Sequence, residues 1–106
     1  MTKISLIGST RYKNLMEKQA SMLRAMGGEV RLPFYDSLEL DEIEIALKNR
    51  ENILWADRIY IYWDGASLGT VFDFGMVFMS GKELRIGHIN DRSMSLFMES
   101  YALGEK

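Results

Sequence analysis

The sequence predicts an α/β fold in which a small parallel sheet of about four strands has helices on both faces. Short runs of β-branched and apolar residues alternate with longer segments in which apolar residues recur every three or four positions. Strands separated by helices of ten or more residues form β-α-β units, and these give parallel sheets with right-handed crossovers. A chain of 106 residues has room for one domain, so we expect a single domain over residues 1–106.

The first strand and helix are marked by a change of period. Residues 3–8, KISLIG, predict a buried strand that stops at the Gly-Ser-Thr break. From 12 to 26 the apolar residues follow helical spacing, and Gly27-Gly28 supplies a left-handed stop. The helix carries a methionine stripe that we expect to pack in the core: Met16, Met22 and Met26.

A short second strand and a second helix follow. Residues 29–32 alternate as a strand that ends at the only proline, and residues 34–40 predict a loop with Asp36-Ser37 as turn residues. The stretch 42–56 has roughly helical apolar spacing, and Asp41 can cap it.

The second half of the chain repeats the pattern. The run 58–63, RIYIYW, is apolar on both faces, which suits a central strand covered on both sides. Helical spacing resumes over 69–80 and stops at Gly81, and residues 83–89 predict a fourth strand. The tail 91–103 carries a helical apolar stripe, which either completes the pocket of a neighbouring copy or covers an edge of the sheet.

Composition excludes several classes of function. A net charge of −2 gives no overall basic field, which disfavours binding of extended nucleic acid. No window of about 18 apolar residues predicts a membrane span, and the first residues enter a strand pattern rather than a cleavable leader, so we expect a cytoplasmic protein. With no Cys and one His, we expect no disulfide, no metal site and no cofactor. The small size, with 11% aromatic residues and eight Met, favours a homodimer or higher homo-oligomer.

Two turns are candidates for ligand binding, GSTRY at 8–12 and DGASLGT at 64–70, because each leaves a predicted strand and enters a helix. N–H groups at a helix start favour anions, and glycine lets a phosphate approach them. Neither turn is a P-loop or a GxGxxG, and the alternative is that both turns only cap their helices. The candidate phosphate- or substrate-binding residues are Gly8, Ser9, Thr10, Arg11, Asp64, Ser67, Gly69 and Thr70.

An ordered set of motifs resembles the nucleoside 2-deoxyribosyltransferase family. The set is GSTRY, then AD at 56–57 before a strand, then SLGTVFDFG, an apolar helix and GKELRI, and it spans about residues 3–89. The Ser-Leu-Gly form of the turn is most similar to the branch of 2′-deoxyribonucleoside 5′-monophosphate N-glycosidases. The resemblance implies a flavodoxin-like or Rossmann-like homodimer with strand order 2-1-3-4, in which a carboxylate attacks the anomeric carbon and water or a second base resolves the glycosyl-enzyme.

The resemblance also implies roles for individual residues. By position, Asp73 takes the place of the nucleophile, Ser67 that of the phosphate-binding serine, and Ser9 with Arg11 that of the nucleotide-contacting loop. Gly69 lets the backbone close on the phosphate. Tyr12, beside the first turn, either orients the nucleophile or packs in the core.

The chain departs from the family pattern at two positions. Asp73 is one methylene shorter than the family's glutamate, which withdraws the carboxylate by about a bond length. Asn49 stands where the family has a second acid and cannot act as a carboxylate base; Glu44 and Glu51 are possible substitutes.

These observations leave three functions open. The first is cleavage, by hydrolysis or transfer, of the N-glycosidic bond of a small nucleoside 5′-monophosphate, with Asp73, Tyr12 and Asn49 at the catalytic centre. The second is a nucleotide-binding or sequestering protein that keeps the cradle without the acids, and the third is an interaction module without a ligand. Asp73 has the alternative role of an acid at the start of a helix, stabilised by the dipole, and Trp63 either stacks on a base or packs in the core.

Overall fold

The computed structural model describes residues 1–35 and 39–104, and the turn predicted at Asp36-Ser37 lies outside this part of the chain. The predicted elements are confirmed with ends that match or differ by one residue, except that the last helix starts later than predicted. In chain order they are β1 (Lys3–Gly8), the 3₁₀ turn η1 (Thr10–Tyr12), α1 (Lys13–Ala25), β2 (Glu29–Arg31), α2 (Glu42–Trp55), β3 (Arg58–Trp63), α3 (Leu68–Ser80), β4 (Glu83–Ile89) and α4 (Ser95–Ala102).

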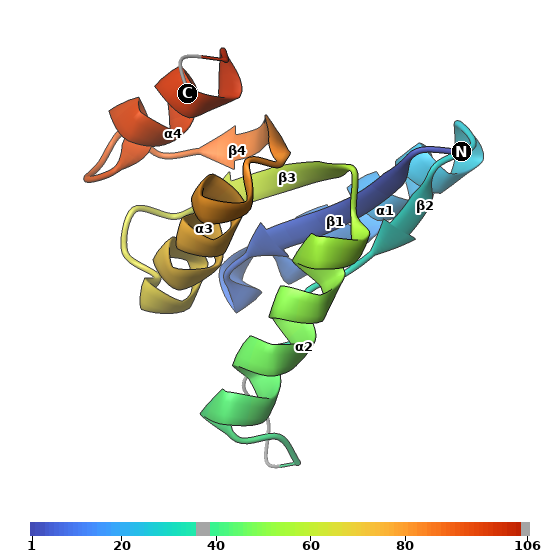
Figure 1. Cartoon of the computed structure of the whole chain (residues 1–106), viewed down its shortest axis with the longest axis horizontal. Helices are drawn as coiled ribbons and strands as arrows, with labels where there is room; N and C mark the ends of the chain where they lie inside the picture. Colours follow the sequence, from blue (N-terminus) through green and yellow to red (C-terminus); the bar gives the residue numbers. More distant parts are fainter. Residues whose placement is uncertain (36–38, 105–106) are drawn as a thin grey trace.

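The sheet is entirely parallel, with strand order β2-β1-β3-β4, which confirms the predicted three-layer α/β fold (Figure 1). Its register pairs Ile4 with Val30 and Gly8 with Tyr62. β3 and β4 remain parallel beyond a register shift at Ile61/Tyr62. The strand order places β1 and β3 side by side at the centre, so the turns that follow them leave the same edge of the sheet.

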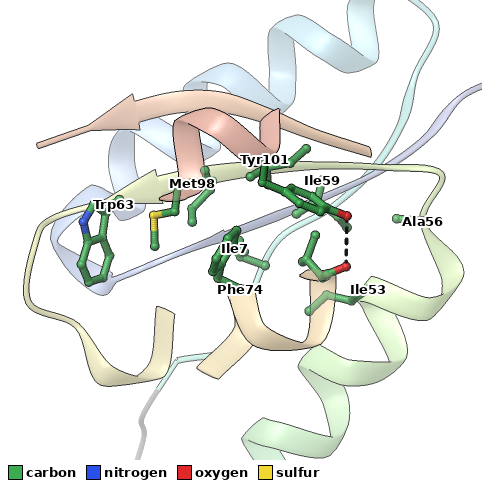
Figure 2. Packing of buried hydrophobic residues seen from close by; sticks show 11 residues of the cluster. Ile7, Ile53, Ala56, Ile59, Trp63, Phe74, Met98 and Tyr101 are labelled. Carbon is green, nitrogen blue, oxygen red and sulfur yellow. Dashed lines mark hydrogen bonds between the residues drawn. The ribbon is translucent and has the colours of Figure 1, made fainter. Parts of the chain in front are cut away.

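Helices cover both faces. α1 lies behind the sheet in Figure 1, and its Met16 and Ala20 pack on Leu6 and Tyr62. The opposite face carries α2, α3 and α4 over a larger core, drawn in Figure 2. β3 supplies alternate side chains to the two cores, as its sequence predicts.

The carboxyl-terminal helix closes the larger core beside β4, so its stripe covers part of the sheet (Figure 2). The Tyr101 hydroxyl lies 2.6 Å from the carbonyl oxygen of Lys82 and 3.4 Å from that of Val77. Trp63 is also a core residue, since it is buried and its indole N–H donates to the carbonyl of Ser93. Among the described residues, no helix has the length and apolar character needed to cross a membrane.

The helix ends agree with the sequence prediction, but the packing of the methionine stripe does not. Asp41 Oδ1 accepts the N–H of Glu44 at 2.8 Å, and Gly81 ends α3 with φ 68°. Met16 is fully buried, whereas Met22 and Met26 are 57% and 81% exposed, so the predicted packing of these two is wrong. At 100° per residue they lie roughly a quarter to a third of a turn away from Met16 on the helix.

Gly8 is required by the close approach of β1 and β3. A Cβ built at this position would lie 2.8 Å from Tyr62 Cβ and 2.9 Å from the Tyr62 carbonyl oxygen.

We expect Gly8→Ala to lower the free energy of unfolding by roughly 1–3 kcal/mol. Urea denaturation measures the change. Gly69→Ala is the matched control because that site is helical and open, with only Ser67 Oγ at 4.0 Å, and we expect a gain of about 0.5–1 kcal/mol. Equal urea midpoints for the two variants would contradict the requirement for glycine at position 8.

Candidate functional site

The two predicted turns meet at the carboxyl edge of the sheet. β1 leads into residues 8–12 and β3 into residues 64–70, and a cavity of about 850 Å³ opens between these turns and α2. A crevice at the carboxyl ends of adjacent parallel strands is the usual ligand position in this class of fold. Most predicted site residues line it, namely Gly8, Ser9, Thr10, Asn49, Ser67, Gly69, Thr70 and Asp73. Arg11, Tyr12 and Asp64 are not among the lining residues.

Asp64 shapes the second turn. Its Oδ1 accepts the N–H groups of Ala66 at 2.9 Å and Ser67 at 2.8 Å, a side-chain turn that aspartate forms readily. Burial alone would raise the pKa of this carboxyl, but the two backbone donors, with Ser9 and Arg11 nearby, hold the pKa below its usual value. Asp64 is therefore an ionised turn former, and Arg11 lies close enough to interact with it.

The start of α3 presents hydrogen-bond donors to the cavity. Ser67 Oγ caps the helix by accepting the Thr70 N–H at 3.3 Å and the Thr70 hydroxyl at 3.0 Å, which leaves the Ser67 hydroxyl hydrogen available to a ligand. The N–H groups of Leu68 and Gly69 find no acceptor within the described chain. Gly69 has open space where a Cβ would stand. This arrangement suits an anion.

The first turn brings three of its predicted residues, Gly8, Ser9 and Thr10, to the cavity. Ser9 Oγ is buried and makes no hydrogen bond with any described residue, although it lies near enough to Asp64 to affect the pKa of that carboxyl. Thr10 is exposed at the cavity. Gly8 also lines the cavity, but contact with Tyr62 already requires a glycine there.

Tyr12 belongs to a polar cluster that joins the two turns. Asn90 Nδ2 donates to the Tyr12 hydroxyl at 3.3 Å and to the Asp64 carbonyl at 3.1 Å. The Tyr12 ring packs on His88 with centroids 4.7 Å apart. Tyr12 is not among the residues that line the cavity, and no hydrogen bond joins it to Asp73 within the described part of the chain. Asn90 was not predicted as a site residue, because its only signal in the sequence is a polar residue directly after a strand.

Asp73 is the distinctive group of the cavity. Its residue is only 7% exposed, and no described residue forms a hydrogen bond or ion pair with it. Burial raises the pKa of this carboxyl to about 7, so roughly half of it is ionised at neutral pH. Ser67, rather than Asp73, caps α3.

Asn49 is committed to the backbone of the segment after β2. Its Oδ1 accepts the Phe34 N–H at 2.9 Å, and its Nδ2 donates to the Phe34 carbonyl at 3.2 Å. The side chain lines the cavity, but its amide already has two partners. Asn49 thus fixes the backbone of Phe34 at the cavity wall through two hydrogen bonds, and we call this arrangement a clamp.

The second carboxylate at the cavity is Glu42, at the start of α2, which sequence reasoning did not identify. Neither Glu44 nor Glu51 lines this cavity, and Glu51 lines a different one. Glu42 has no sequence signal beyond its place in the first turn of a helix.

Apolar side chains from α2, α3 and the segment after β2 complete the cavity. Ile43, Leu68 and Phe72 are 71%, 84% and 58% exposed, so they belong to its rim. Tyr35 lies deeper, and burial together with the charge of Glu17 raises its pKa to about 12. The phenol is neutral at physiological pH.

The pKa of Asp73 predicts how its removal affects stability. The carboxyl binds its proton more tightly in the folded state, at about 7 against an ordinary 3.8, so stability falls as the pH rises between these values and is lowest above 7. We expect Asp73→Asn to be more stable than the native protein by roughly 2–4 kcal/mol at pH 8, with little difference near pH 4.

Thermal or urea unfolding at both pH values tests this expectation. Glu99→Gln is the control, because it removes an exposed carboxyl of α4. A gain for Asp73→Asn that is the same at pH 4 and pH 8 would show that the carboxyl is not desolvated.

Comparison of the chain with protein-family models, with curated proteins and with solved structures gives no match in any of the three.

Proposed function

We propose that the protein cleaves the N-glycosidic bond of a nucleoside 5′-monophosphate, by hydrolysis or by transfer of the sugar, with Asp73 as the nucleophile. One observation supports the proposal: a buried carboxyl without a partner in the described chain lines the same cavity as a helix start whose first N–H groups have no acceptor there. Buried acids that serve structure are normally paired or hydrogen-bonded. An unpaired one with a raised pKa in a cavity indicates a functional group.

The spacing along α3 supports a sugar phosphate as substrate. Gly69 and Asp73 are four residues apart and both line the cavity, so they share a helix face about 6 Å apart along the axis. That is roughly the span from the 5′-phosphate to the anomeric carbon of a nucleotide. A phosphate held by Ser67 and the N–H groups of residues 68 and 69 brings C1′ toward Asp73. The apolar walls, with Phe34 and Tyr35, accommodate the base.

The reaction proceeds in two displacements. An Asp73 oxygen bonds to C1′ as the bond from C1′ to the base nitrogen breaks, and the departing base takes the electron pair and a proton. Water then attacks C1′, the ester bond to Asp73 breaks, and the carboxylate is restored. Glu42, the other carboxylate at the cavity, is our candidate for giving the first proton and accepting the one from water. In transfer, a second base replaces water.

A sequestering protein is the second candidate, and the geometry of Asn49 favours it. Both ends of the Asn49 amide are engaged by Phe34, so the position that the resemblance assigns to a second acid holds a structural clamp. A cavity that binds nucleotide without turnover would follow if Glu42 is too far from the leaving base to assist it.

Release of free base from a panel of ribo- and deoxyribonucleoside 5′-monophosphates tests the activity. We expect Asp73→Ala to reduce release by at least roughly 10³-fold and Glu42→Gln by about 10²-fold. Because the nucleophile must be ionised, the native rate should rise as the pH approaches about 7 from below.

Gly69→Ala separates binding from folding. The added methyl covers the N–H donors at the start of α3 while favouring the helix, so nucleotide affinity should fall in a more stable protein. Nucleotide binding by calorimetry with no base release would support the sequestering protein. If the protein neither binds a nucleotide nor releases a base, both functions are contradicted.

We also propose that the protein is a homodimer that buries α2 and α3. α2 and α3 are neighbours (Figure 1). Each carries an exposed apolar stripe with the same spacing of four and seven residues. The stripes are Ile43, Leu47 and Leu54 on α2 and Leu68, Phe72 and Met79 on α3. Gly75 lies within the second stripe with nothing near its missing side chain, which permits close approach of a partner. Exposed apolar surface of this extent is typical of an interface.

Light scattering after gel filtration tests the dimer. We expect the native protein at twice its chain mass of 12.2 kDa, and Leu47→Glu and Met79→Glu at the mass of one chain. Met26→Glu is the matched control, since this methionine is 81% exposed but lies on α1. A native protein at the mass of one chain would contradict the proposal.

A further inference from the structure

A second cavity, of about 490 Å³, lies beside β2 and collects positive charge. Three cationic side chains line it, Arg24 from α1, Arg31 from β2 and Lys48 from α2, with Glu51 as the only carboxylate among its lining residues. The whole chain carries a net charge of −2, so this local excess opposes the overall balance. We refer to it below as the basic cleft.

The two arginines are held in place by neutral partners. Arg24 Nη2 donates to the Val30 carbonyl at 2.8 Å. Arg31 Nη1 donates to Asn52 Oδ1 at 3.4 Å, and its guanidinium carbon lies 4.0 Å from the centre of the Trp55 ring. Asn52 is itself buried and also donates to a backbone carbonyl. The guanidinium groups are therefore positioned without being neutralised.

No ion pair links any of the three cations to a carboxylate within residues 1–35 and 39–104. Lys48 instead lies over the Phe34 ring, with Nζ 5.3 Å from its centre. Like charges gathered at a hollow raise the local potential and attract counter-ions. A stacked guanidinium keeps a free N–H edge, which matches the oxygen atoms of a phosphate.

We propose that the basic cleft binds a small phosphate-bearing anion, at a site separate from the cavity that contains Asp73. Its volume lies within the range of small-molecule sites, and Val30, Leu32 and Phe34 add apolar contact for the rest of such a ligand. The proposal does not depend on the glycosidic activity. Phe34 lines both cavities, so the two sites share a wall.

Titration of the full, ¹⁵N-labelled chain with inorganic pyrophosphate tests the proposal. The indole N–H signal of Trp55, assigned through Trp55→Phe, reports on the basic cleft, and residues 64–70 report on the first cavity. We expect a saturable shift of the Trp55 signal. Arg31→Gln should weaken the fitted affinity roughly tenfold or more, since a charge-assisted hydrogen bond is lost.

Matched variants identify the site. Lys48→Gln should weaken the affinity several-fold, whereas Lys18→Gln, an equal charge change on the exposed surface of α1, should not. Ser67→Ala should leave the Trp55 titration unchanged. A Trp55 signal that does not shift, or that shifts equally in Arg31→Gln, would overturn the proposal. Shifts confined to residues 64–70 would also overturn it, while supporting an anion at the first cavity.

Discussion

The parallel pairing of β1 with β3 is the contact on which the candidate site depends. Gly8 lies opposite Tyr62 at a separation that leaves no room for a side chain, and both strands end at the same edge of the sheet. The turns that follow are therefore neighbours, and Asn90, after β4, joins them through Tyr12 and the Asp64 carbonyl. A side chain at position 8 would separate the two strands at the point where their turns meet.

The same architecture places Asp73 where water scarcely reaches it. Its neighbours in sequence, Phe74 and also Val77, belong to the larger core, so α3 cannot rotate to expose the carboxyl without losing that packing. Domains of this size have free energies of unfolding of about 5–15 kcal/mol. An ionised carboxyl in such a place lowers this free energy by a substantial fraction. Acids that reduce stability in this way are common where a chemical role requires them.

Local signals predicted the fold, and the site only in part. The run of β3 residues, the Asp41 cap and the Gly81 stop are short-range features, and each is confirmed. The roles of Asn49 and Glu42 depend on where the chain after β2 passes α2, and no periodicity encodes that path. The resemblance to the nucleoside 2-deoxyribosyltransferase family stays a prediction, since the fold alone does not specify an activity.

That path after β2 links the two cavities. Pro33 has no N–H to donate to a sheet, so β2 ends after three residues and the carbonyls of Leu32 and Phe34 are released from strand pairing. Asn52 and Asn49, three residues apart on α2, take these two carbonyls. Side-chain amides, rather than a strand ladder, thus hold the wall shared by the Asp73 cavity and the basic cleft. Because this edge is not held by a sheet, the position of that wall depends on these two side-chain hydrogen bonds.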